Sequence, residues 1–163
     1  MDETSFRSFY DQSAPRLFSY LLRVCGERAL AQDLLQETYF RFLTANLPPL
    51  TEVQARNYLF RIATNLMRDR WRHHREEPLP DKIEEPSDAP CIDRQLEMRQ
   101  AFQRLKLRER QLLWLAYVEG ANHKEIAECT GLRAGSVRLL LFRARRRLAK
   151  LIREGAPKME ISK

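Results

Sequence analysis

The stretch GLRAGSVRLLLFRARRRL, residues Gly131–Leu148, decides how the rest of the chain is interpreted. It opens with a glycine, and between Arg133 and Lys150 the chain carries seven basic residues and no acidic one. Its apolar residues recur at three- and four-residue spacing, as on the buried side of a helix: Val137, Leu140, Leu141 and Ala144. The stretch therefore predicts an amphipathic helix with a basic outer side.

The residues just upstream predict a second, shorter helix. Asn122 is a favourable N-cap, and Glu125 stands three positions later, the spacing of a capping box. Gly131 can end this helix in the left-handed conformation, and the chain re-enters a helix within about four residues. Three apolar residues are then expected to face inward: Ile126, Ala127 and Leu132. Together the two helices form a predicted helix-turn-helix, whose second helix enters a groove of DNA.

The basic helix leaves Arg138, Phe142, Arg143 and Arg146 free on its outer side. Arginine reads guanine edges near the start of such a helix, whereas later arginines more often contact phosphates. The alternative is a basic surface helix that only meets solvent.

Charge is unevenly distributed along the chain. The 163 residues have a net charge of +7, but residues 76–93 hold seven acidic residues and one lysine. The rest of the chain is therefore six charges more positive than the total, which favours a polyanionic partner such as nucleic acid. Four prolines stand among these acidic residues: Pro78, Pro80, Pro86 and Pro90. This composition is typical of a linker.

Apolar residues elsewhere follow the helical period, and no alternating strand pattern is convincing. We expect helices over about 5–24, 28–45, 52–75, 92–106 and 108–119. Gly26 should end the first helix, and Thr51 with Gln54 forms a second predicted capping box. The predicted fold is all-α, with two small helical domains joined by a flexible acidic linker and a helix-turn-helix in the C-terminal domain.

The predicted third helix combines basic and aromatic residues. Arg56, Arg61, Arg68, Arg70, Arg72 and Arg75 are interspersed with Tyr58, Phe60 and Trp71, and Asp69 is the only acidic residue among them. Arginines can hold phosphates while aromatic rings stack on unpaired bases, which suits a single strand. Some of the aromatic rings could equally belong to the core.

The predicted second helix has a polar side formed by Asp33, Gln36 and Glu37, next to Arg41. Such a side often serves only solubility. Acidic residues beside a basic domain also suit a protein partner, so both interpretations stay open.

Enzyme chemistry is not indicated. Cys25, Cys91 and Cys129 lie far apart and outside any metal-ligand spacing, so no metal and no cofactor is predicted, and Cys25 and Cys129 are expected to be buried thiols. A cysteine nucleophile would need one of three histidines as its base: His73, His74 or His123.

The acidic, polar N-terminus is unlike a signal peptide, and no apolar run is long enough for membrane insertion. We therefore expect a cytoplasmic protein.

Three segments, in this order, resemble the extracytoplasmic-function group of bacterial sigma factors, in the sigma-70 family. DLLQETYFRF at 33–42 resembles the segment that binds core RNA polymerase, and ARNYLFRIATNLMRDRWR at 55–72 resembles the segment that melts and reads the minus-ten element. The sequence from Leu107 to Leu148 resembles the domain that reads the minus-thirty-five element. The resemblance covers nearly the whole chain and implies a sigma factor without catalytic chemistry.

The resemblance assigns roles to particular residues. Contacts to the clamp coiled coil of core RNA polymerase would come from Asp33, Gln36, Glu37 and Arg41. Contacts to the minus-ten DNA would come from Arg61, Asn65, Arg68, Asp69, Trp71 and Arg72, along the melted non-template strand, with a flipped base received by the loop 46–54. Contacts to duplex minus-thirty-five DNA would come from Ser136, Arg138, Leu139, Phe142, Arg143 and Arg146.

The implied domains are sigma region 2 at 1–75, the acidic linker at 76–91, sigma region 4 at 92–155 and a tail at 156–163. The polymerase flap and an anti-sigma factor are further implied partners. Family members often carry Ser or Thr where Arg133 stands and a polar residue where Leu139 stands, so the promoter sequence cannot be transferred from relatives. The alternative function is a stand-alone helix-turn-helix regulator that binds duplex DNA, which would need a dimer interface.

Overall fold

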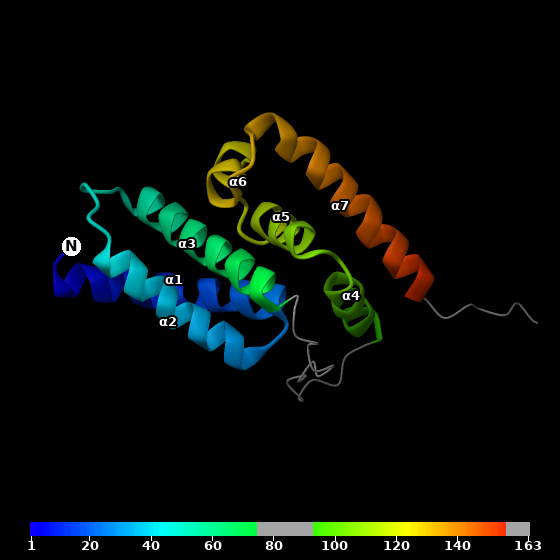
Figure 1. Ribbon diagram of the computed structural model, residues 1–163, viewed down its shortest axis with the longest axis horizontal. Coiled ribbons are helices and arrows are strands. Elements are labelled where there is room, and N and C mark those ends of the chain that lie inside the picture. Colours follow the sequence, from blue (N-terminus) through cyan, green and yellow to red (C-terminus); the bar gives the residue numbers. More distant parts are fainter. Residues whose placement is uncertain (75–92, 156–163) are drawn as a thin grey trace, which may run out of the picture.

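The computed structural model describes residues 1–74 and 93–155, and all regular secondary structure within these ranges is α-helical (Figure 1). The helices are α1 (Glu3–Cys25), α2 (Arg28–Thr44), α3 (Glu52–His74), α4 (Asp93–Gln103), α5 (Leu107–Tyr117), α6 (His123–Thr130) and α7 (Ala134–Gly155). The all-α prediction is confirmed, and each predicted helix matches an observed one to within a few residues. The predicted linker 76–91, the tail 156–163 and Cys91 lie outside the described residues.

The helix ends follow the predicted capping chemistry. The backbone N–H of Thr51 donates to Gln54 Oε1 at 3.0 Å, and the backbone N–H of Gln54 donates to Thr51 Oγ1 at 3.2 Å, which closes the capping box at the start of α3. Gly26 ends α1 with φ at +77°, and its N–H donates to the Leu22 carbonyl at 2.8 Å. A residue with a Cβ would be strained at this φ, so glycine is required here.

Helices α1, α2 and α3 form a three-helix bundle. Between α1 and α2, the Phe9 and Phe42 rings stack with centroids 5.3 Å apart. Between α1 and α3, the Tyr20 hydroxyl hydrogen-bonds the Thr64 hydroxyl at 2.8 Å in the fully buried interior. The Thr64 hydroxyl also donates to the Phe60 carbonyl, so the buried polar atoms of this pair are satisfied.

In the second group of helices, α4–α7, the other three helices lie around α5 (Figure 1). Nearly every turn of α5 is buried, and its leucines Leu112 and Leu115 are 1% exposed. Helix α7 contacts α4, α5 and α6, and α6 also contacts α5. The buried side of α7 faces α5. Within the described residues no helix is long and apolar enough to cross a membrane.

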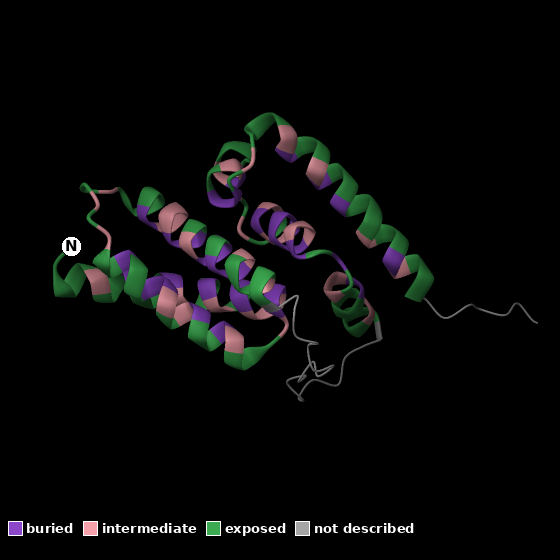
Figure 2. Cartoon of the chain, in the orientation of Figure 1, coloured by how far each residue is buried: buried purple, intermediate pink, exposed green. Residues whose placement is uncertain are grey.

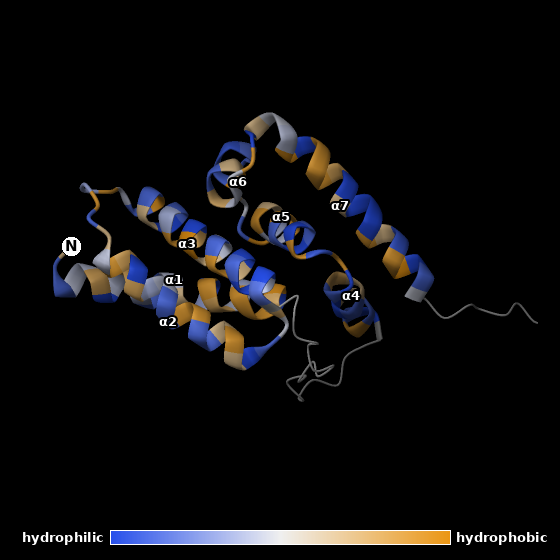
Figure 3. Ribbon diagram, viewed as in Figure 1, coloured by the Kyte–Doolittle hydropathy of each residue, from blue (hydrophilic) through white to orange (hydrophobic). Residues whose placement is uncertain are grey.

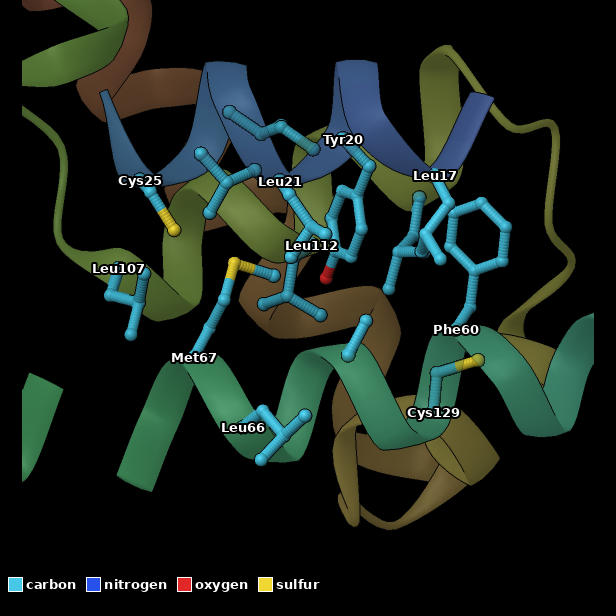
Figure 4. Close-up of a cluster of buried hydrophobic side chains, with 14 of the residues drawn as sticks. Leu17, Tyr20, Leu21, Cys25, Phe60, Leu66, Met67, Leu107, Leu112 and Cys129 are labelled. Atoms are coloured by element: carbon cyan, nitrogen blue, oxygen red, sulfur yellow. The ribbon is translucent and has the colours of Figure 1, made fainter. Parts of the chain in front are cut away.

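The cores of the two groups merge into one. Figure 4 shows Leu17, Tyr20 and Leu21 of α1 and Met67 of α3 in the same apolar cluster as Leu112 of α5. Helix α5 packs against α1, and α6 packs against α3. Because one side of α3 and one side of α5 are buried by this packing, the position of the second group determines which residues of α3 can reach a ligand.

Candidate nucleic-acid interface

The predicted helix-turn-helix is confirmed and consists of α6 and α7. The backbone N–H of Glu125 donates to Asn122 Oδ1, and that of Asn122 donates to Glu125 Oε2, both at 2.9 Å. Gly131 ends α6 with φ at +72°, the left-handed conformation expected from the sequence. The chain enters α7 at Ala134, where the N–H of Ser136 donates to the Arg133 carbonyl at 2.9 Å in place of a side-chain cap.

One side of α7 is buried and the other is free. Val137, Leu141 and Ala144 are buried as predicted, and exposed residues follow the outer side of the helix (Figure 2). The five residues predicted to contact minus-thirty-five DNA that lie on the exposed surface are Arg138, Leu139, Phe142, Arg143 and Arg146, while Ser136 is half-buried. The structure therefore brings this set together on one uncovered helix.

Two apolar side chains interrupt the basic surface of α7. Leu139 is 51% exposed and Phe142 is 47% exposed, and the Arg146 guanidinium carbon lies 5.7 Å from the centre of the Phe142 ring. Apolar contacts of this kind suit thymine methyl groups, and arginines beside them suit guanine edges or phosphates. The surface can thus contribute both base contacts and phosphate contacts.

Other arginines of α7 are held by the protein itself. Arg145 donates to the Tyr117 hydroxyl at 2.7 Å, and Arg147 pairs with Glu109 at 3.7 Å. These contacts hold α7 against α5. The basic run in the sequence could not separate them from the arginines that remain free, because that separation depends on where α5 lies.

The polar side of α2 is exposed and lies next to α3. Asp33, Gln36 and Arg41 are exposed, and Glu37 is half-buried, with its carboxylate 2.7 Å from Arg41 Nε. Residues of α2 and α3 line one open groove: Asp33, Leu34, Gln36, Glu37, Phe40, Arg41, Leu66, Asp69, Arg70, Arg72 and His73. The structure therefore places the predicted polymerase-binding residues beside part of the predicted minus-ten set.

Two exposed apolar residues on α2 were not among the predicted site residues. Phe40 is 63% exposed and Leu43 is 57% exposed. Large exposed apolar side chains next to a charged side are common at protein interfaces. The signal was present in the sequence, since Leu34, Thr38 and Phe42 recur at four-residue spacing on the buried side of the helix and both residues fall outside that series.

The predicted minus-ten residues of α3 do not form one free surface. Arg61, Asn65, Asp69 and Arg72 are exposed, whereas Arg68 and Trp71 are half-buried. Arg68 Nη1 donates to the Thr130 carbonyl at the end of α6, at 3.0 Å. The Trp71 ring faces Arg110 of α5, whose guanidinium carbon is 5.1 Å from the ring centre. Two of the six residues are therefore engaged by the second group of helices.

The buried thiols are confirmed. Cys25 is 9% exposed and Cys129 is 2% exposed. Burial raises the pKa of each thiol from 9.0 to about 12. A thiol held in its neutral form is a poor nucleophile, so neither cysteine is suited to covalent chemistry.

Comparisons with known proteins agree with this geometry. The family described as Sigma-70 region 2 matches residues 9–77, and the family described as Sigma-70, region 4 matches residues 95–148. The chain is 29% identical to RNA polymerase sigma factor CarQ of Myxococcus xanthus, over 93% of this chain and 91% of that protein. It is also 29% identical to ECF RNA polymerase sigma factor SigL of Mycobacterium tuberculosis, over 91% of this chain and 89% of that protein.

Solved structures share the fold. The sigma factor RpoE of Bartonella quintana, solved with the anti-sigma factor NepR, superposes with a TM-score of 0.68, at 19% identity over 91% of this chain and 97% of that chain. A PhyR–NepR complex from Sphingomonas sp. Fr1 gives a TM-score of 0.67, at 18% identity over 96% of this chain and 94% of that chain. The two sigma-70 regions occur here in the order predicted from the sequence, which sets the stand-alone regulator aside. The chain belongs to the sigma-70 family and is an extracytoplasmic-function (ECF) sigma factor, a non-enzymatic initiation factor that directs RNA polymerase to promoters.

Proposed function

We propose that this sigma factor contacts its promoter and core RNA polymerase through three sets of residues, on α2, α3 and α7, of which the first two meet at the groove between α2 and α3. The polar side of α2 contacts the clamp coiled coil through Asp33, Gln36, Glu37 and Arg41. Helix α3 contacts the melted minus-ten strand through Arg61, Asn65, Arg68, Asp69, Trp71 and Arg72. Helix α7 contacts the minus-thirty-five duplex through Ser136, Arg138, Leu139, Phe142, Arg143 and Arg146. We assign 1–75 to region 2 and 92–155 to region 4.

One observation carries the proposal: α7 buries its apolar stripe and leaves Arg138, Leu139, Phe142 and Arg143 uncovered on consecutive turns. A helix-turn-helix presents such residues to the major groove. Arginines at the start of the helix can discriminate between bases, and each well-placed bidentate contact contributes about 1–3 kcal/mol. The apolar tips of Leu139 and Phe142 suit thymine methyl groups.

The α2 surface supports the polymerase assignment by its composition. Asp33 and Gln36 are exposed carboxylate and amide groups, and the neighbouring Phe40 adds an exposed ring. An apolar centre with a charged rim is the usual composition of a protein interface, and it is unsuited to DNA because carboxylates repel phosphates. Because core RNA polymerase is a cytoplasmic enzyme, we place the protein in the cytoplasm.

An apolar groove supports an anti-sigma factor as a regulatory partner. It lies between the end of α1 and helices α4, α5 and α7, and its apolar lining includes Leu22, Phe102, Leu113, Trp114 and Leu148. Four arginines also line it, Arg23, Arg28, Arg99 and Arg145, and no Asp or Glu of the described residues does. We propose that this groove accepts an amphipathic helix with acidic flanks from an anti-sigma factor. Addition of that anti-sigma factor to the reconstituted complex should release the sigma factor from core RNA polymerase.

The experiment is reconstitution of the purified chain with bacterial core RNA polymerase. We expect co-elution and promoter-selective transcription on fragments of the chain's own genome. Glu37→Lys breaks the Glu37–Arg41 pair and reverses one charge of the α2 surface, so it should weaken polymerase binding by about 1 kcal/mol or more while leaving the helix content unchanged. Binding is measured by titration with a labelled chain.

Glu27→Lys is the matched control, because it makes the same charge change on an exposed residue whose side chain forms no cap hydrogen bond to α2. Equal losses for both variants would reject a specific α2 contact. Absence of co-elution, with tight duplex binding by the chain alone, would reject the polymerase-dependent function.

A further inference from the structure

The apolar groove between the end of α1 and helices α4, α5 and α7 also has the size of a small-molecule site. Its volume is about 710 Å³, and mostly apolar pockets of this size commonly hold small organic ligands. Its lining includes Leu113, which is 5% exposed, and the half-buried ring of Trp114. Four apolar side chains of the lining are more than one third exposed: Leu96, Met98, Tyr117 and Val118. The described residues therefore leave a large part of this apolar surface uncovered.

Positive charge surrounds the apolar surface. Four arginines line the groove: Arg23, Arg28, Arg99 and Arg145. Within residues 1–74 and 93–155, none of the four forms an ion pair. The pKa of Arg23 is lowered, first by burial and then by the charge of Arg99, which indicates that these two cations lie close together. A negative charge placed beside them would offset this repulsion, so the groove favours an anionic ligand.

Two of the four arginines are held in place by aromatic side chains. Arg145 donates to the Tyr117 hydroxyl at 2.7 Å, and the Arg28 guanidinium carbon lies 5.8 Å from the centre of the Phe18 ring. Both contacts leave the positive charge in place, because neither aromatic side chain carries a negative charge. Part of the cationic rim is thus ordered before a ligand arrives, which reduces the entropy cost of binding.

We propose that this groove binds a small amphipathic anion, a long-chain carboxylate. The hydrocarbon chain lies on the apolar lining, and the carboxylate lies beside Arg23 and Arg99. An uncharged chain would lose the second contact, and a chain with a cationic head group would be repelled. The site would make the sigma factor a direct receptor for a small molecule, which is a role separate from promoter recognition.

The carboxylate would compete with an anti-sigma factor. The helix proposed for the same groove combines an apolar side with acidic flanks, so the two ligands have the same chemistry and cannot be bound together. A long-chain carboxylate would therefore release the sigma factor from such a partner. This consequence rests on the proposed function, whereas the binding of the carboxylate to the chain does not.

The test uses the full chain without polymerase or DNA. The probe is dodecanoate, kept below the concentration at which it forms micelles and titrated by calorimetry. Affinity should rise roughly fourfold for each methylene added between octanoate and dodecanoate, because each one buries more apolar surface. In a Trp71→Phe chain, Trp114 is the remaining tryptophan, and its emission should change as dodecanoate binds.

The head group is tested by reversing charge on either partner. Dodecyltrimethylammonium has the same chain with a cationic head and should bind roughly tenfold more weakly than dodecanoate. Arg99→Glu should weaken dodecanoate binding roughly threefold or more and strengthen binding of the cation. Arg94→Glu is the matched control, since it makes the same charge change on an exposed residue of α4 that does not line the groove.

Equal affinity for the two head groups, or equal losses for Arg99→Glu and Arg94→Glu, would overturn the inference. Absence of dodecanoate binding, or binding that leaves the Trp114 emission unchanged, would also overturn it. Neither result would bear on the proposed function, because co-elution with core RNA polymerase and promoter-selective transcription are measured without an amphiphile. A chain that binds dodecanoate but does not co-elute with polymerase would reject the proposed function and leave this site intact.

Discussion

The two helices proposed to contact DNA are presented in opposite ways. Helix α7 leaves Arg138, Leu139 and Arg143 uncovered, whereas α3 has Arg68 and Trp71 engaged by α6 and α5. Yet both helices show hydrophilic and hydrophobic residues alternating along their length (Figure 3). The difference teaches that the packing between the two regions, and not the composition of a helix, determines which basic surface is available.

The largest expected effect concerns whether the two regions form one folding unit. Leu112→Ala empties a position that is 1% exposed in the merged core and should lower the free energy of unfolding by about 2–5 kcal/mol. Because Leu112 lies in one apolar cluster with residues of α1 and α3, region 2 should be destabilised as well (Figure 4). Urea unfolding monitored by circular dichroism measures the stability of the whole chain, and hydrogen exchange in α1–α3 measures that of region 2.

Leu96→Ala is the control for that experiment, since Leu96 is 39% exposed and its loss should change stability by less than about 0.5 kcal/mol. Unchanged hydrogen exchange in α1–α3 of the Leu112→Ala chain would show that the regions fold independently. The packing between the regions could then not explain the difference between α3 and α7.

An intermediate effect tests the uncovered helix. Arg143→Ala should weaken binding to the cognate minus-thirty-five element by about 1–3 kcal/mol if Arg143 contacts a base. Because the outer side of α7 is already uncovered, the loss of binding free energy should be the same for the isolated chain and the holoenzyme. Variants of Arg68 or Trp71 on α3 should not show this equality, because those side chains are engaged by other helices. Arg153→Ala, at an exposed position near the end of α7, is the control. An equal loss for Arg143→Ala on every sequence, measured by fluorescence anisotropy, would make Arg143 a phosphate contact.

The smallest effect is a pH dependence of the covered side of α3. Burial raises the pKa of the Cys129 thiol from 9.0 to about 12 in the folded chain. The stability that comes from keeping this thiol neutral is complete below about pH 9 and is lost as the pH rises toward 12. Cys129→Ala should make the free energy of unfolding less dependent on pH in that window. An unchanged slope in urea titrations would show that Cys129 is not buried against α3 in solution.

The individual helices and their ends could be predicted because their signals are local. The spacing of apolar residues located α1–α7, and the capping boxes at Thr51 and Asn122 and the glycine at 131 determined where helices begin or end. These features depend on residues within a few positions of one another, so one sequence is sufficient to find them.

The packing between the regions could not be predicted in the same way. The apolar periodicity indicates that Leu112, Met67 and Tyr20 are buried, but it does not say which helix covers them. Arg68 had the same appearance in the sequence as Arg61, yet one bonds the Thr130 carbonyl and the other is exposed. That distinction depends on contacts between residues about sixty positions apart.

The stacking of Arg110 on Trp71 gives the molecule an optical signal. The sequence contains two tryptophans, and the second, Trp114, packs beside Phe102 within the helices of region 4. An indole ring that faces a guanidinium in one arrangement and water or a nucleobase in another emits differently in each. A Trp114→Phe chain would therefore report through its own fluorescence, without a dye, whether Arg110 keeps its place over the Trp71 ring in solution.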